Sequence, residues 1–121
     1  MATGDAVINA EDLTEVDIIK IDIEGGESKA ISGLMDTIKR FEPYIICEIL
    51  PLPTEDEGVT QFRTMSANNI LSNLQGLNYI ALNLVTWSLI NGVEDLSTSL
   101  ESCNYLFLPK AKTEMLEYKK F

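Results

Sequence analysis

The chain has 121 residues, of which 45% are hydrophobic and 23% are charged, a balance typical of a single globular domain. Its formal net charge of −10 argues against nucleic-acid binding, which needs a basic face, and weakly against an anionic membrane surface. Histidine is absent, which excludes Ser–His and Cys–His nucleophile pairs and any His-based zinc site.

Residues 1–15 are polar and mixed, and we expect them to form a lead-in segment. They lack the basic stretch and apolar core of a secretory signal, and no later apolar run is as long as a membrane span. The cytoplasm is therefore the expected location, without membrane contact. Residues 16–110 are expected to form the domain, and residues 111–121 a tail that makes one short helix or frays.

The first predicted elements are a strand, a helix and a second strand. Residues 16–23 are rich in isoleucine, which predicts a strand covered on both faces and ended by two glycines. Apolar residues then recur at helical spacing over 27–40, which predicts one helix that Pro43 stops. A second apolar strand is expected over 44–50.

The later elements are one helix and two or three strands. A helix is expected over 59–74, and we predict strands over 79–84 and 104–108 with a weaker strand signal around 86–90. Residues 91–103 read as a loop. The apolar stripe of the predicted helix comprises Val59, Phe62, Leu71 and Leu74. The alternation of strands and helices predicts an α/β fold with parallel strands, and the closing strands predict an antiparallel edge.

Three charged side chains interrupt the first predicted strand. Strand alternation puts Lys20, Asp22 and Glu24 on one side of it. Glu48 would share that face if the first two strands are parallel neighbours, and an unpaired buried charge is costly. Two interpretations stay open: a structural ion pair between Lys20 and Glu48, or a Glu48 that lies at the carboxyl end of its strand and faces a cleft.

Asp22 and Glu24 lie where the strand passes into a loop, and open α/β sheets bind their ligands at such carboxyl ends. Gly25 and Gly26 would let the backbone turn sharply and approach a ligand closely. Together with Glu27, these carboxylates would repel a phosphate, but they suit a substrate hydroxyl, an amino group or a hard cation such as magnesium. Asp22 and Glu24 would be the ligands of such a cation, and no other metal site is predicted. The alternative is a solvated turn.

The two cysteines, Cys47 and Cys103, lie in or beside apolar stretches and form no C-x-x-C pair. Two reduced core thiols are the expected state. A disulfide would require neighbouring strands to hold the two residues, and a cytoplasmic location disfavours it.

A set of motifs runs through residues 12–51: VDIIKIDIEGGE, a helix that ends before proline, and P-x-I-x-x-E. This set resembles the FkbM family of S-adenosylmethionine-dependent methyltransferases, whose pattern is vDlIKiDvEGaE followed by the same helix and P-x-I-x-x-E. NYLFLPK at 104–110 also resembles the last strand of that family. The matching positions are Asp17, Ile19, Lys20, Ile21, Asp22, Glu24, Gly25, Glu27, Gly33, Pro43, Ile45 and Glu48.

The resemblance implies a class I, Rossmann-like methyltransferase sheet of which this chain holds strands four to seven. The last strand would lie antiparallel between strands five and six, which would put Cys47 and Cys103 on neighbouring strands. Family members methylate hydroxyl groups on sugars, polyketides and similar small molecules. We therefore expect part of an O-methyltransferase that supplies the acceptor side of the cleft and serves a small-molecule acceptor. The implied site has Asp22, Glu24 and Glu48 as catalytic residues and Gly25, Gly26 and Glu27 as substrate-binding residues.

One part of the family pattern is missing from this sequence. The family's D-x-G-A-N turn and the acidic end of its second strand cannot be found, and no G-x-G occurs. We therefore expect a carboxyl-terminal half-domain that binds no S-adenosylmethionine and is inactive by itself. The alternative function is a non-catalytic α/β association module, because an unpaired strand edge favours a homo-oligomer or pairing with a chain that carries the missing half.

Overall fold

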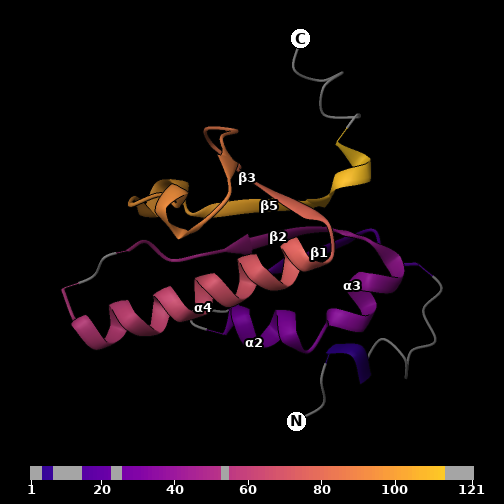
Figure 1. Ribbon diagram of the computed structural model, residues 1–121, viewed down its shortest axis with the longest axis horizontal. Coiled ribbons are helices and arrows are strands. Elements are labelled where there is room, and N and C mark those ends of the chain that lie inside the picture. Colours follow the sequence, from indigo (N-terminus) through magenta and orange to yellow (C-terminus); the bar gives the residue numbers. More distant parts are fainter. Residues whose placement is uncertain (1–3, 7–14, 23–25, 53–54, 114–121) are drawn as a thin grey trace.

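Residues 4–6, 15–22, 26–52 and 55–113 are described by the computed structural model, in which a mixed five-stranded sheet has its helices on one side (Figure 1). The first elements are β1 (Ile18–Ile21), α2 (Glu27–Ser32), α3 (Met35–Phe41), β2 (Tyr44–Glu48) and α4 (Glu57–Gly76). They are followed by β3 (Tyr79–Asn83), β4 (Leu89–Ile90), η1 (Val93–Asp95), η2 (Leu100–Ser102), β5 (Asn104–Pro109) and η3 (Lys110–Lys112). The α/β class predicted from the sequence is thereby confirmed.

The strand order is β1-β2-β5-β3-β4. β1 and β2 pair in parallel, whereas β5 is antiparallel to both β2 and β3, and β4 is antiparallel to β3. The last strand thus lies between two strands that precede it, as the family resemblance implied. The antiparallel edge predicted from the closing strands is the β3–β4 hairpin.

The helix predicted over 27–40 is in fact two helices, because a turn at Gly33 separates α2 from α3. The amino terminus of α3 is capped by Asp5, which lies far from it in the sequence. The Asp5 carboxylate accepts hydrogen bonds from the backbone N–H of Thr37 at 2.8 Å and of Asp36 at 3.2 Å, and from the Thr37 hydroxyl at 2.6 Å. These bonds satisfy N–H groups that a helix start leaves open, a contribution of about 1 kcal/mol to stability.

α4 is longer than the predicted 59–74. Asp56 is its N-cap, and Asp56 Oδ1 accepts a hydrogen bond from the Val59 backbone N–H at 3.0 Å. Gly76 is its last residue, and Leu77 is the C-cap. An acidic side chain that satisfies the first-turn N–H groups explains why the helix starts two residues earlier than its apolar pattern indicates.

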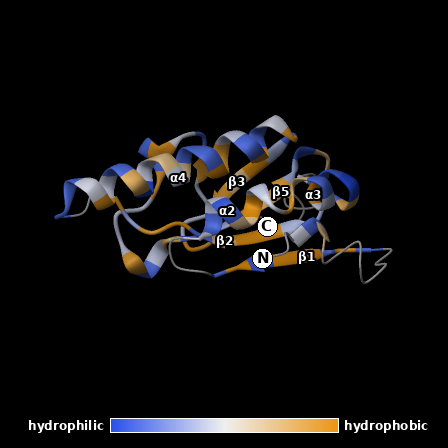
Figure 2. Ribbon diagram, turned by 90° about the horizontal axis from the view of Figure 1, so that it is seen from below, coloured by the Kyte–Doolittle hydropathy of each residue, from blue (hydrophilic) through white to orange (hydrophobic). Residues whose placement is uncertain are grey.

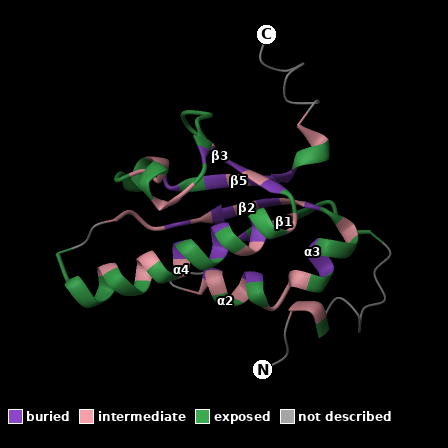
Figure 3. Ribbon diagram, in the orientation of Figure 1, coloured by how far each residue is buried: buried purple, intermediate pink, exposed green. Residues whose placement is uncertain are grey.

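One face of the sheet carries the core, since α2, α3 and α4 all lie on that side (Figures 1 and 2). Buried side chains on it come from every strand: Ile21, Ile45, Cys47, Tyr105, Phe107, Tyr79, Ala81 and Ile90. Figure 3 colours stretches of the strands and of the helices as buried. Tyr79 keeps its hydroxyl satisfied there by donating to the Pro43 carbonyl oxygen at 2.7 Å. A buried hydroxyl without such an acceptor would destabilise the fold.

The prediction that the first strand is covered on both faces is wrong. Ile18 is 62% exposed and Lys20 is exposed, whereas Ile21 is buried. The parallel register pairs Lys20 with Ile46, so both residues lie on the face opposite to α2, α3 and α4. Ile23 of the predicted strand lies outside the described residues. No helix in the described ranges is long and apolar enough to cross a membrane, and the cytoplasmic location stays a prediction.

Both cysteines are free and buried, as expected for core thiols. Cys47 lies in β2 and Cys103 directly precedes β5, and the Ile49 N–H donates to the Cys103 carbonyl oxygen at 2.9 Å. The strands that hold them are therefore neighbours. Burial, and then the carboxylates of Glu27 and Glu48, raise the pKa of Cys47 from 9.0 to about 12.

We expect the thiols of the native chain to resist modification by a thiol reagent such as dithiobis(nitrobenzoate) at pH 8, because the thiolate is the reacting form. The pKa of Cys47 in the folded chain lies above the ordinary value of 9.0. The neutral thiol therefore contributes fully to the stability of the fold below pH 9, and this contribution is lost as the pH rises toward 12. The control is the chain unfolded in guanidinium, in which both thiols react. Rapid modification of either thiol in the native chain would contradict the buried, neutral state.

Candidate functional site

Three of the carboxylates singled out in the sequence, Asp22, Glu27 and Glu48, lie near the ends of β1 and β2. The parallel register pairs Ile21 with Cys47, so Asp22 and Glu48, which each come one residue later, lie at the same edge of the sheet. Asp22 is exposed, whereas Glu48 is half-buried. Glu27, the first residue of α2, is only 4% exposed.

The carboxylates at this edge act electrostatically on the two buried thiols. After burial, the charges of Glu27 and Glu48 raise the pKa of Cys47. Burial and then Glu48, with a smaller effect from Asp22, raise the pKa of Cys103. Three acidic groups from different elements therefore act on one pair of neighbouring thiols, so the site is strongly acidic.

Lys20 and Glu48 lie on the same face of the sheet, because Lys20 pairs with Ile46 and Glu48 follows Ile46 by two residues. Lys20 is exposed, and Glu48 is the last residue of β2. Glu48 does not line the cavity described below, so the interpretation in which it faces a cleft stays a prediction. The ion pair between Lys20 and Glu48 stays a prediction.

Two further candidates, Glu24 and Gly25, lie outside the described residues. Gly26 is described and is the N-cap of α2, with a φ of −106° and a ψ of 3°. Because this φ is negative, the backbone at Gly26 does not by itself require glycine. Its carbonyl oxygen accepts a hydrogen bond from the Ala30 N–H at 2.9 Å, which ties the loop to the first turn of α2.

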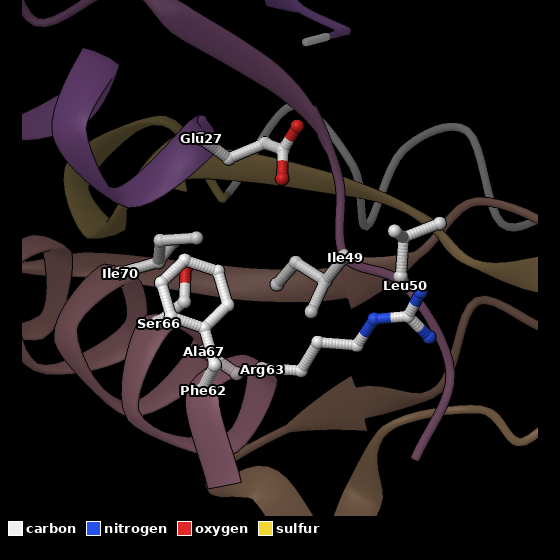
Figure 4. Close-up of a pocket in the computed structure, with 8 residues that line it drawn as sticks. All are labelled: Glu27, Ile49, Leu50, Phe62, Arg63, Ser66, Ala67 and Ile70. Carbon is white, nitrogen blue, oxygen red and sulfur yellow. The ribbon is translucent and has the colours of Figure 1, made fainter. Parts of the chain in front are cut away.

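A small cavity of about 20 Å³ opens beside Glu27, between the start of α2, the segment after β2, and α4, and neither Asp22 nor Glu48 lines it. Figure 4 shows Glu27 reaching toward it from α2 and Arg63 from α4, with Ile49 between them. Its lining is Glu27, Ile49, Leu50, Phe62, Arg63, Ser66, Ala67 and Ile70. The wall is mostly apolar with one buried carboxylate and one guanidinium, and a volume of this size admits a group about as large as one water molecule, such as a hydroxyl.

The guanidinium of Arg63 is held at the edge of this cavity. Arg63 Nη1 donates a hydrogen bond of 3.4 Å to the Pro51 carbonyl oxygen, which joins α4 to the segment after β2. Arg63 is half-buried, so its charge acts in a medium less polar than water. It can therefore offer its remaining N–H donors to a ligand in the cavity.

Sequence reasoning identified Glu27 but not the lining residues of α4. Phe62 was assigned to the apolar stripe of the helix together with Leu71 and Leu74. Those two leucines are buried, whereas Phe62 is 58% exposed and lines the cavity. The available signal was the spacing of Phe62, Arg63 and Ser66, which puts one aromatic, one basic and one hydroxyl side chain on adjacent positions of a helical surface.

A metal site is not formed by the described part of the chain, where no three His, Cys, Asp or Glu side chains come together as ligands. The predicted pair of metal ligands, Asp22 and Glu24, includes one residue outside the described ranges. Cation binding by this pair stays a prediction.

Comparison with known protein families agrees with the motif set found in the sequence. The family model described as the methyltransferase FkbM domain matches residues 3–81, which include β1, β2 and the residues that line the cavity. No curated protein and no solved structure matches the chain. The match spans well over half of the 121 residues, so the chain belongs to the FkbM methyltransferase domain family.

Proposed function

We propose that this domain forms the acceptor side of a methyltransferase that transfers a methyl group from S-adenosylmethionine to a hydroxyl oxygen of a small molecule. The observation that supports the proposal is the buried Glu27 carboxylate in a cavity at the carboxyl ends of β1 and β2. Asp22 and Glu48 lie at the same edge of the sheet. Open α/β sheets bind their ligands at this edge.

The carboxylates are suited to hold and activate an acceptor hydroxyl. A carboxylate accepts the hydrogen bond of the hydroxyl and thereby fixes the direction of its oxygen lone pairs. As the oxygen forms its new bond to carbon, the same carboxylate takes up the proton, which is general base catalysis. Asp22, being exposed, can return that proton to water, whereas Glu27 and the apolar wall exclude water from the bound group.

The described residues do not fit S-adenosylmethionine as a whole. The cavity at Glu27, of about 20 Å³, is far smaller than pockets that enclose drug-sized ligands, which measure roughly 300–1,000 Å³. The sequence also contains no G-x-G turn whose backbone N–H groups could approach the cofactor closely. We therefore propose that this chain contributes acceptor contacts and that it does not hold the methyl donor by itself.

Calorimetry and product analysis test this function together. Titration of the chain with S-adenosylmethionine is expected to give no measurable binding, and micromolar affinity would show that the donor site lies in this chain. With the methyl-transferring enzyme that carries this domain, mass spectrometry should locate the added methyl group on oxygen. Methylation of carbon or nitrogen, with none on oxygen, would refute the proposed reaction.

A non-catalytic role in association is the second candidate, and one observation favours it. β1 is an edge strand of the described sheet, and Ile18 on it is 62% exposed. Unpaired edges promote pairing with another strand, here that of a second copy or of a chain that completes the domain. Sedimentation equilibrium should then show a dimer, and a monomer at high concentration would count against self-association.

A further inference from the structure

We propose that the acceptor of this domain is an uncharged amphipathic molecule, whose hydroxyl group enters the cavity at Glu27 while its apolar part lies along the amino-terminal half of α4. The surface that would bind the apolar part consists of Val59, Phe62 and Met65, here called the apolar rim. The inference rests on the proposed function, because it identifies the class of molecule that the same site receives.

The apolar rim is not part of the core. Its three side chains are 39%, 58% and 67% exposed and follow one another at intervals of three residues, which places neighbouring members next to each other on the helix. The core-facing stripe of α4 is a different set, formed by Ala67, Ile70, Leu71 and Leu74. In Figure 3 the first turns of α4 are exposed or half-buried, and Figure 2 shows this end of the helix extending past the sheet.

The rim and the cavity form one continuous surface, because Phe62 belongs to both. Val59 lies one turn before Arg63, which also lines the cavity. From residue 59 to residue 65 a helix rises ~9 Å, about the length of an extended chain of seven or eight carbon atoms. A ligand whose hydroxylated end occupies the cavity can therefore cover the whole rim with a short aliphatic portion.

The charge balance around the rim is unfavourable for an anionic ligand. Glu55, Asp56 and Glu57 are exposed and lie two to four residues before Val59, against one positive charge at the cavity, that of Arg63, and the whole chain carries a net charge of −10. Carboxylates so close to the surface repel sulfates, phosphates and fatty acids. A second copy of this chain would bring the same acidic segment against itself, so self-association through the rim is also opposed. An uncharged amphiphile covers the apolar side chains without either penalty.

A binding experiment on the full chain tests the inference with n-octyl β-D-glucoside below its micelle-forming concentration. Amide chemical shifts in the ¹⁵N-labelled chain should change for Glu27 and for residues 59–66, and these changes should saturate. Glucose tests the head group alone, and octyl sulfate tests an anionic head group on the same alkyl chain. Both are expected to bind about tenfold more weakly, because one loses the apolar contact and the other is repelled.

The variant Phe62→Ser should weaken octyl glucoside binding by about fivefold to tenfold, because it removes the side chain shared by rim and cavity. Leu100→Ser is the matched control, since Leu100 is 73% exposed and lies in η2 outside the cavity lining. Equal binding by the Phe62 variant and the wild type, or binding of octyl sulfate as tight as that of the glucoside, would overturn the proposal. A dimer that Phe62→Ser dissociates would also overturn it, because the occupant of the rim would then be a second copy.

The outcomes separate this inference from the function on which it rests. If the enzyme methylates a hydroxyl and Phe62→Ser leaves the KM for the acceptor unchanged, the amphipathic acceptor is refuted and the reaction stands. If no methyl group is transferred to oxygen, the reaction is refuted whether or not octyl glucoside binds.

Discussion

Asp22→Asn is expected to lower the turnover of the methyl-transferring enzyme by roughly 100-fold or more, the usual contribution of a general base. The substitution keeps the shape of the side chain and removes its negative charge, so a hydroxyl bound at the carboxyl end of β1 loses its proton acceptor. Asp22 is exposed, and the free energy of unfolding should change by no more than about 0.5 kcal/mol. The measurements are the release of S-adenosylhomocysteine and the thermal unfolding of the variant.

Glu94→Gln is the matched control for Asp22→Asn. Glu94 is an exposed carboxylate in η1 that does not line the cavity, so its neutralisation should leave turnover unchanged. Full activity of the Asp22 variant would remove Asp22 from the catalytic residues and leave Glu27 and Glu48 as candidates. Equal losses in both variants would mean that the net charge of the chain matters, and not the position of the carboxylate.

Phe107→Ala is expected to lower the free energy of unfolding by about 3–5 kcal/mol, the cost of a large cavity in a packed core. Phe107 is 1% exposed in β5, where it pairs with Ile45 of β2 on one side and Ala81 of β3 on the other. A single domain has a total stability of only about 5–15 kcal/mol, so this loss is a large fraction of it. Urea denaturation followed by circular dichroism measures the effect.

Leu100→Ala is the control for this stability prediction, because Leu100 is 73% exposed and its truncation should cost less than about 0.5 kcal/mol. A loss below about 1 kcal/mol for Phe107→Ala would mean that the neighbours of Phe107 close the cavity or that the side chain is not packed between β2 and β3.

The sequence predicted the strands well, because each is a short apolar run bounded by glycine, proline or polar residues. It failed to predict the division of the first helix, since the Asp5 cap on α3 comes from more than 30 residues earlier in the chain and leaves no local pattern. The sequence also predicted, wrongly, that both faces of β1 are buried. A run of isoleucines has the same composition whether helices lie on one side of the strand or on both, so periodicity could not distinguish the two cases.

For the candidate site, the sequence singled out Glu27, which lines the cavity, but not the residues of α4 that face it. Asp22, Glu27 and Glu48 stand out because carboxylates are rare in apolar strands and at glycine-rich turns. Phe62 and Arg63 looked like ordinary residues of an amphipathic helix. Which side of α4 lies against α2 depends on how the helix sits over the sheet, and that arrangement is set by long-range packing.

The position of β5 has a consequence for the order in which this domain can be assembled. β5, the last of the described strands along the chain, lies between β2 and β3 and so joins the β1–β2 pair to the β3–β4 hairpin. On the ribosome, the two halves of the sheet therefore emerge first and stay apart until residues 104–109 leave the exit tunnel. Contacts of such high sequence separation slow folding. Until these contacts form, the edges of β2 and β3 that later pair with β5 are unpaired. Chaperones or other unfolded chains can bind to them during that time.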